Sequence, residues 1–307
     1  MASRESRLFY LFLRFIKKKK FLEMQFVFGK FDFYNCKEPP KEIHNVCHVE
    51  KRQVNGRNVF VLKPKTKKSE IQILYLHGGA YVQNFVKQHW KFLSLLVEHT
   101  HCTITAPDYP LAPTHTYRDA FEMVIPLYKE IILQGDSAHT ILMGDSAGGG
   151  FALAMAQRMK RDDVAQPTKI ILLSPWLDIT LKNPEIEKID LIDPFLGVAG
   201  LRKAGLSYAG NSDPENFMLS PIYGPLEKLG SISVFIGSRD LLVADARKLN
   251  MLALEKDVSI NYREYKDMVH VWMFLNFRES KEVRKEIIAL IVGNDKEKHM
   301  TPFDEIN

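Results

Sequence analysis

The stretch ILMGDSAGGGFALA, residues 141–154, decides the fold of this chain. It joins a short apolar run, which is typical of a buried strand, to a run of small residues that is typical of a helix. Gly144, Ser146 and Gly148 stand at the junction, although glycine and serine are weak helix formers. The pattern G-x-S-x-G predicts a sharp strand-to-helix turn, in which the serine projects above a sheet and the glycines leave room for close neighbours.

Short apolar or β-branched runs alternate with helical patterns on both sides of this junction. The runs predict strands at residues 57–64, 71–77, 102–109, 140–144, 169–175, 232–238 and 259–265. The helical patterns lie at residues 89–100, 116–134, 147–161, 243–256 and 271–292. Strands that alternate with helices form a mostly parallel sheet covered by helices on both faces. The sequence therefore predicts an α/β fold.

Two segments do not follow this alternation. The N-terminal segment precedes the first predicted strand, and the segment between the strands at 169–175 and 232–238 is much longer than a simple crossover. No linker rich in Pro, Gly or Ser divides the chain, and no internal repeat is present. We therefore expect a single domain over residues 1–307, with a small helical cap built from residues 1–42 and about 180–215.

Length and composition limit the class of protein. The chain has 307 residues, of which 46% are hydrophobic and 26% charged, and this is ample for a large core. Its three cysteines form no disulfide framework and favour a reducing compartment, so we expect a cytoplasmic protein. The formal net charge of +5 is small for this length and gathers partly in residues 17–20, so we expect no nucleic-acid partner.

The N-terminal stretch RLFYLFLRFIKKKKF, residues 7–21, mixes apolar and basic residues. Its apolar run is far shorter than the roughly 20 residues that cross a bilayer, and no A-x-A-like cleavage site follows it. An amphipathic helix packed on the body of the protein is the simplest interpretation. One alternative is weak peripheral contact with an anionic membrane surface, because apolar residues beside a lysine cluster suit that interface. A nuclear-type signal or a nucleic-acid contact is a third interpretation.

A serine in a strand-to-helix turn points to nucleophilic catalysis. Ligand sites of parallel sheets lie beyond the carboxyl ends of the strands, and a serine nucleophile needs a histidine base and a carboxylate that orients the histidine. Asp240 and His270 follow the last two predicted strands, so we predict Ser146, Asp240 and His270 as nucleophile, acid and base. Asp245 is the alternative acid, although its place in a predicted helix favours an exposed carboxylate near the helix N-terminus.

Acyl transfer also needs N–H donors for the negative charge that grows on the carbonyl oxygen. The stretch YLHGGAYV, residues 75–82, follows a predicted strand, where the HGGG-type loop of esterases and lipases belongs. Ala80 replaces a third glycine there, but the donors are main-chain groups and need not be lost. We expect the N–H of Ala147 to complete this oxyanion hole, and His77 to be a structural residue of the loop.

These motifs together resemble the hormone-sensitive-lipase-like branch of the α/β-hydrolases, a group of esterases with an HGG loop and a GDSAGG elbow. DYPLAP at residues 108–113 is similar to the DYRLAPE stretch of that family, SPW at 174–176 to a strand end after its elbow, and GSRDLLVADA at 237–246 to its acid segment. The likeness extends from about residue 71 to residue 270. It implies an α/β-hydrolase fold, no cofactor, and a preference for esters of short acyl chains.

The resemblance also implies roles for single residues. It assigns Ser146 as nucleophile, His270 as base and Asp240 as acid. The oxyanion donors that it implies are Gly79, Ala80 and Ala147, with Gly78 as a lesser donor. The chain departs from the family pattern at three positions, namely Ala80 for glycine, Pro110 for arginine and Thr114 for glutamate. The first departure narrows the acyl pocket or shifts the loop, and the other two concern a structural turn.

The expected activity is that of a serine carboxylesterase that hydrolyses short-chain acyl esters of small molecules through an acyl-enzyme. Two alternatives stay open: a deacetylase or amidase that acts on a small natural product, and an α/β-hydrolase that binds a ligand without cleaving it. The side chains that we expect along the substrate pocket are Tyr81, Trp176, Phe195, Tyr208 and Leu241. A homodimer also stays open.

A metal site is not expected. HNVCH at residues 44–48 groups His44, Cys47 and His48 near Cys36, but this spacing matches no common zinc pattern. The residues that begin with Val46 alternate like a strand, which favours a structural interpretation of the cluster.

Overall fold

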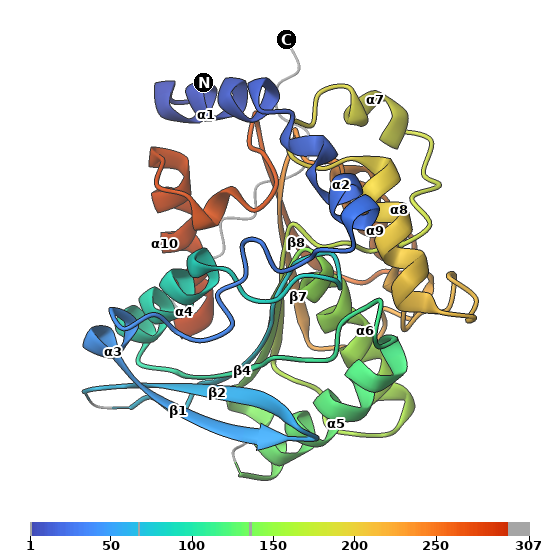
Figure 1. Cartoon of the computed structure of the whole chain (residues 1–307). Helices are drawn as coiled ribbons and strands as arrows, with labels where there is room; N and C mark the ends of the chain where they lie inside the picture. Colours follow the sequence, from blue (N-terminus) through green and yellow to red (C-terminus); the bar gives the residue numbers. More distant parts are fainter. Residues whose placement is uncertain (1, 67, 135–136, 294–307) are drawn as a thin grey trace.

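The computed structural model describes residues 2–66, 68–134 and 137–293. Within these ranges eight strands form one sheet in the order β1-β2-β4-β3-β5-β6-β7-β8 (Figure 1). Their bounds are β1 Cys47–Val54, β2 Arg57–Pro64, β3 Gln72–Leu76, β4 Thr103–Pro107, β5 Thr140–Asp145, β6 Lys169–Leu173, β7 Ser231–Gly237 and β8 Ile260–Tyr265. β2 runs antiparallel to β1 and β4, and the other neighbouring pairs are parallel. The predicted mostly parallel sheet is confirmed.

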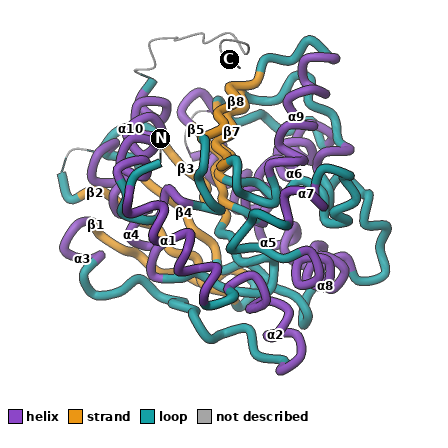
Figure 2. The backbone as a smooth tube through the Cα atoms, turned by 90° about the horizontal axis from the view of Figure 1, so that it is seen from above, coloured by secondary structure: helices purple, strands orange, loops and turns teal. Residues whose placement is uncertain are grey.

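Helices cover both faces of this sheet, as Figures 1 and 2 show. On one face lie α4 (Lys87–Thr100) and α10 (Arg278–Val292), and on the other lie α5 (Tyr117–Gln134), α6 (Ala147–Arg161) and α9 (Val243–Glu255). The short elements are α3 (Ile43–Val46), η2 (Ser137–His139), η3 (Pro221–Tyr223) and η4 (Trp272–Phe274). The predicted α/β fold with both faces covered is therefore present.

Alternate residues of the central strands supply two separate cores. In β5, Leu142 packs into the core under α5 and α6, whereas Ile141 and Met143 pack into the core under α4 and α10. All of β5 is buried, because side chains that point to either face meet a layer of helices. This two-sided burial explains why the strand signal was a continuous apolar run.

The N-terminal segment and the insertion between β6 and β7 lie together at one end of the sheet (Figure 1). The first carries α1 (Arg4–Phe15), η1 (Lys18–Lys20) and α2 (Phe21–Phe28), and the second carries α7 (Ile186–Asp190) and α8 (Val198–Ala209). α2 packs on α8, and a side chain at Gly200 would come within 2.9 Å of the backbone nitrogen of Glu23. An ion pair of 2.7 Å between Lys19 and Asp190 joins the same two segments.

Two sequence-based expectations about local structure were wrong. The last helix begins at Arg278 and not at residue 271, because Val271 has a left-handed backbone (φ 46°) and residues 272–274 form the separate turn η4. Asp245 is buried and not exposed, since the insertion covers it and Asn183 Nδ2 donates to its Oδ1 at 2.9 Å. Burial raises the pKa of Asp245 to about 6.

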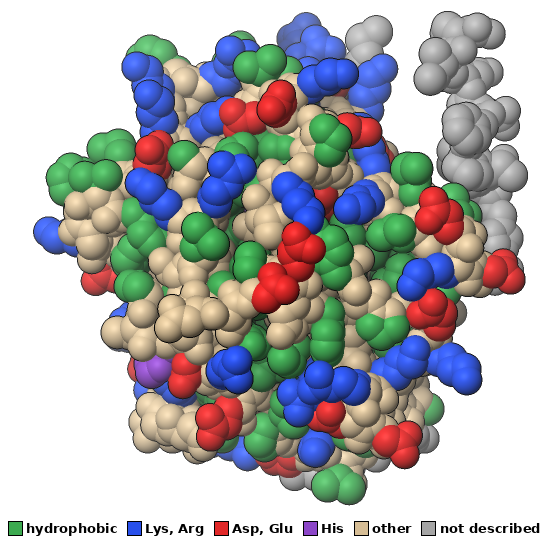
Figure 3. Space-filling model, turned by 90° about the vertical axis from the view of Figure 1, so that its right-hand side faces the viewer, with side chains coloured by type: hydrophobic (Ala, Val, Ile, Leu, Met, Phe, Trp, Pro, Cys, Tyr) green, Lys and Arg blue, Asp and Glu red, His purple; other side chains and the backbone are tan. Residues whose placement is uncertain are grey.

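The surface carries charges of both signs. On the face shown in Figure 3, lysine and arginine side chains are interspersed with aspartate and glutamate, and the described residues of this face form no continuous basic patch.

Candidate active site

Ser146 lies in the tight turn between β5 and α6. Its backbone has φ 51° and ψ −121°, a strained conformation for a residue with a side chain. A Cβ at Gly144 would collide with the carbonyl oxygen of Gly148, and one at Gly148 would collide with that of Leu76. The glycines are therefore needed because the turn presses against the neighbouring strand, as the sequence pattern predicted.

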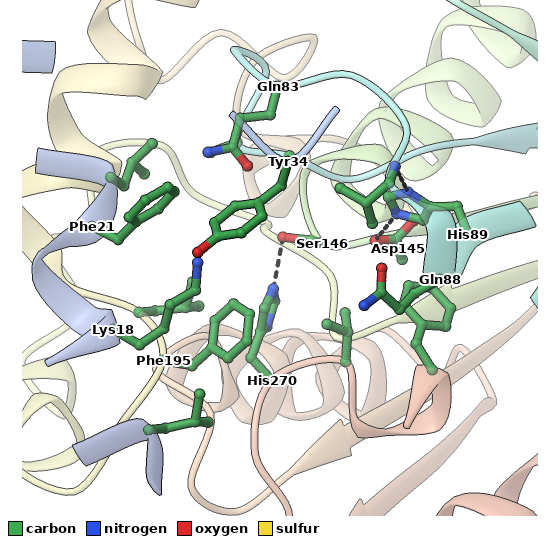
Figure 4. A pocket seen from close by; sticks show the side chains of 18 of the residues that line it. Lys18, Phe21, Tyr34, Gln83, Gln88, His89, Asp145, Ser146, Phe195 and His270 are labelled. Atoms are coloured by element: carbon green, nitrogen blue, oxygen red, sulfur yellow. Dashed lines mark hydrogen bonds and ion pairs between the residues drawn. The ribbon is translucent and has the colours of Figure 1, made fainter. Parts of the chain in front are cut away.

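Three predicted residues meet at the carboxyl ends of three strands. His270 Nε2 lies 2.9 Å from Ser146 Oγ, and His270 Nδ1 lies 2.8 Å from Asp240 Oδ2 (Figure 4 draws the first contact). Their exposed fractions are 7% for Ser146, 3% for His270 and 0% for Asp240. This geometry allows His270 to take the serine proton while the carboxylate fixes the tautomer with the proton on Nδ1.

The pKa of His270 reflects two opposing effects. Burial alone would lower it, but the charge of Asp240 and the hydrogen bond to it outweigh burial and raise the pKa above the usual 6.5. Asp240 itself is held by the Leu242 N–H, which donates to its Oδ1 at 3.0 Å. The imidazole is therefore a stronger base than an isolated histidine.

A second buried carboxyl group, that of Asp193, accepts a hydrogen bond from the backbone next to Asp240. Its Oδ2 accepts the N–H of Leu241 at 2.6 Å, and its Oδ1 accepts those of Phe195 at 2.6 Å and Leu196 at 2.9 Å. Burial and the neighbouring Asp240 raise the pKa of Asp193 to about 7. Sequence reasoning missed this residue. Its only local signal is an Asp-Pro pair, which is common at turns.

The HGGA loop borders the same cavity as Ser146 through Gly79 and Ala80. Gly79 has φ +120°, and Ala80 and Tyr81 have φ 53° and 61°, so three consecutive residues have positive φ. Among the described residues, no protein group accepts the N–H of Gly79 or Ala80. Ala147 is the first residue of α6, so its N–H has no acceptor within the helix. These three groups are available to an oxyanion.

Gly78 has a different role from the one predicted for it. Its N–H donates to Asp145 Oδ1 at 2.9 Å and is therefore not free for a substrate oxygen. Tyr75 donates to the same oxygen at 2.6 Å, and His89 Nε2 lies 3.2 Å from Asp145 Oδ2. Burial would raise the pKa of Asp145, but His89 and the hydrogen bonds outweigh it and lower the pKa. Asp145 thus anchors the loop to the serine turn.

His77 is occupied within the loop. Its Nδ1 lies 2.7 Å from the carbonyl oxygen of Gly78, so Nδ1 carries the proton and donates. Burial lowers the pKa of His77 to about 3, which keeps the ring neutral. The ring also stacks on Tyr109 with centroids 4.4 Å apart.

A cavity of about 570 Å³ opens above Ser146 and His270 (Figure 4). Most of its wall is apolar and comes from segments far apart in the sequence. Among the lining residues are Leu13 and Phe21 from the N-terminal segment, Phe195 and Leu201 from the insertion, and Phe274 after the histidine. The sequence predicted the N-terminal segment as part of a cap, but it did not identify which residues of that segment line the cavity.

Four of the five predicted pocket residues do not line this cavity, and only Phe195 does. Tyr81 stacks on Tyr208 with ring centroids 3.9 Å apart and on Trp176 at 5.5 Å, and all three rings are buried in the core. Leu241 is fully buried in the same core. The backbone at Ala80 and Tyr81 is left-handed, and the Tyr81 ring packs with these two rings beneath the loop. Large aromatic side chains bury a large apolar area in such a position.

The expected absence of a metal site at residues 44–48 stays a prediction. No group of three or more His, Cys, Asp or Glu side chains in residues 2–66, 68–134 and 137–293 is arranged to hold a metal ion. Cys47 instead donates from Sγ to the Ile43 carbonyl at 3.6 Å, and Cys36, Cys47 and Cys102 are free thiols.

A mostly parallel sheet that presents a serine, an aspartate and a histidine in that chain order, after β5, β7 and β8 here, is typical of the α/β-hydrolase class. A family model described as alpha/beta hydrolase fold matches residues 73–274. The chain belongs to this family.

Two similar proteins are named as an esterase and an acetyl-hydrolase. The chain is 29% identical over 237 residues to an esterase of Acinetobacter venetianus, with 75% of this chain and 78% of the relative covered. It is 27% identical over 241 residues to an acetyl-hydrolase of Streptomyces hygroscopicus, with 78% of each chain covered. A solved hormone-sensitive lipase from a metagenome library has a similar fold, with a TM-score of 0.81, 24% identity, and 94% of this chain and 99% of that chain covered.

Proposed function

We propose that this protein is a serine carboxylesterase in which Ser146 is the nucleophile, His270 the general base and Asp240 the orienting acid. The observation that carries the proposal is the continuous contact from Ser146 Oγ to His270 at 2.9 Å and from His270 to Asp240 at 2.8 Å. The relatives named esterase and acetyl-hydrolase support the same reaction class.

The reaction consists of two acyl transfers. His270 Nε2 takes the hydroxyl proton as Ser146 Oγ attacks the ester carbonyl, and the N–H groups of Gly79, Ala80 and Ala147 stabilise the oxyanion. The tetrahedral species collapses, the ester C–O bond breaks, and His270 returns the proton to the alcohol oxygen. Water then loses a proton to His270 and attacks the acyl-enzyme, which releases the acid and restores the serine hydroxyl.

The dimensions of the cavity favour small esters. Its volume of about 570 Å³ lies in the range of pockets for small molecules, and the N-terminal segment and the insertion close over Ser146 as a cap. Ala80 lines the same cavity as Ser146, and a glycine at this position would leave more room. These features support short acyl chains as substrates.

A panel of 4-nitrophenyl esters tests this preference. We expect kcat/KM to be highest for the acetate or butyrate and to fall at least about tenfold for the laurate, as the short-chain proposal requires. Stopped or continuous release of 4-nitrophenolate measures the rates. A laurate preference would contradict the short-chain proposal, and faster cleavage of 4-nitroacetanilide or an acetylated sugar would favour the amidase or deacetylase alternative.

The N-terminal helix also supports weak contact with an anionic membrane. α1 leaves Leu8, Leu11, Phe12 and Phe15 exposed by 54 to 85%, next to the lysines of η1. None of the helices in the described ranges has the length and hydropathy needed to cross a bilayer. A cytoplasmic location is supported by the free thiols of all three cysteines.

Sedimentation with lipid vesicles tests the membrane contact. We expect the protein to bind vesicles that contain phosphatidylglycerol more than vesicles of phosphatidylcholine alone, since the basic residues add electrostatic attraction. Phe15→Ser should weaken this binding, whereas Leu133→Ser, which changes another exposed side chain on α5, should not. Equal sedimentation with both vesicle types would contradict the contact.

A further inference from the structure

Lys18 extends into the cavity above the proposed nucleophile. Its Nζ lies 4.0 Å from the ring centroid of Phe21, 4.8 Å from that of Tyr34 and 5.4 Å from that of Phe195. Figure 4 shows these four side chains along one side of the cavity, facing the region of Ser146. The preceding Lys17 has a left-handed backbone (φ 51°), which turns the chain into η1.

The ammonium of Lys18 has no carboxylate partner among the described residues. Lys87, which also lines the cavity, pairs with Glu42 at 2.7 Å, and Lys19, the next residue in the sequence, pairs with Asp190 at 2.7 Å. Burial lowers the pKa of Lys18 to about 8, and no neighbouring carboxylate raises it. A partly buried cation without a counter-ion is unfavourable, and a methionine would fill the same space without that penalty.

The aromatic rings around Lys18 fix its position relative to the reacting groups. Faces of aromatic rings attract a cation, so the ammonium is held in the cavity although its stem is flexible. The Phe195 ring lies between Lys18 and the proposed base. Its centroid is 5.4 Å from Lys18 Nζ and 5.6 Å from the ring centroid of His270. Lys18 and Ser146 line the same cavity, so a small substrate that binds Lys18 lies near the serine.

We propose, on the basis of the proposed esterase function, that Lys18 is a specificity-determining residue that selects esters carrying a carboxylate elsewhere in the molecule. The substrate supplies the negative charge that the protein does not. A carboxylate fits better than a phosphate, because one ammonium balances a single charge and a phosphate at pH 7 carries nearly two. The remaining wall of the cavity is mostly apolar and suits the carbon chain between the carboxylate and the ester.

Matched pairs of substrates test this inference. Mono-(4-nitrophenyl) glutarate and 4-nitrophenyl valerate differ by a carboxylate on the acyl side, and 4-acetoxybenzoate and 4-acetoxybenzamide differ by a carboxylate on the leaving side. For each pair, the ratio of kcat/KM for the anionic ester to that for the neutral ester is measured. Lys18→Met should lower this ratio at least about tenfold in one pair, as expected for the loss of a charged contact.

Two further variants make the result specific. Lys18→Arg keeps the charge and should retain most of the ratio, whereas Lys20→Met removes an exposed lysine of the same turn and should leave it unchanged. Ratios that Lys18→Met leaves unchanged in both pairs overturn the inference while the esterase function stands. If the wild-type protein hydrolyses none of the four esters, the proposed function itself fails.

Discussion

Ser146→Ala is expected to lower kcat/KM for 4-nitrophenyl acetate by about 10⁶, the size observed when a serine nucleophile is removed from a hydrolase. The alanine lacks the oxygen that forms the acyl-enzyme, and the neighbouring amides alone provide only a small residual rate. The fold should persist, because alanine needs no more space in the turn than serine. Initial rates, together with thermal unfolding followed by circular dichroism, measure both quantities.

Ser212→Ala is the matched control for this variant. Ser212 lies outside the cavity, where its hydroxyl accepts a hydrogen bond from Arg118 at 3.3 Å, and its removal should leave the esterase rate within about twofold of wild type. Turnover by Ser146→Ala comparable to that of Ser212→Ala would show that Ser146 is not the nucleophile.

Asp240→Asn is expected to lower kcat by about 10⁴, as the same change does in other serine hydrolases. An asparagine donates to Nδ1 or accepts from it with no charge, so it neither fixes the tautomer nor stabilises the imidazolium.

The pH dependence of kcat/KM is a second measurement of the same contact. His270 acts as a base only when neutral, so wild-type kcat/KM should fall as pH drops below a pKa that lies above 6.5.

The acid limb of the profile should move in a defined direction in Asp240→Asn. The Asp240 carboxylate is the main influence that raises the pKa of His270, and without it burial dominates and lowers that pKa. The limb should therefore shift to lower pH, beneath a much lower plateau. Asp245→Asn is the control, because Asp245 contacts Asn183 and not His270. A loss in Asp245→Asn as large as that in Asp240→Asn would reassign the acid.

The central part of the fold could be predicted from sequence because its strands are buried on both faces. β3, β5, β6 and β7 therefore appear as near-continuous apolar runs, and α6 begins at the residue that the glycine pattern indicated. β1 was left out of the series of predicted strands, although the residues that begin with Val46 alternate like a strand. It lies at the edge of the sheet and most of its side chains are exposed, so it is not an apolar run. The start of α10 was wrong because a positive φ at Val271 leaves no clear sequence signal.

The candidate site also contains residues that the sequence predicts and residues that it does not. Ser146, His270 and Asp240, which the structure places in hydrogen-bond contact, could be predicted because each follows a strand and the chain order is restricted. The contacts of Asp145 with Tyr75, Gly78 and His89 join positions 56 to 70 residues apart, and no local pattern reports them. The pocket wall depends on how the N-terminal segment packs on the insertion. Hydrophobic residues of the core and of a pocket look alike in sequence, which is why Tyr81, Trp176 and Tyr208 were misplaced.

Labelling with a fluorophosphonate tests the central claim most directly, because this reagent reacts with an activated serine and then stops. Intact-mass and peptide mass spectrometry measure how much label is bound and where. The account predicts one label per chain on Ser146, with labelling strongly slowed in His270→Ala. A label on another residue, or no label on a folded protein, would contradict it.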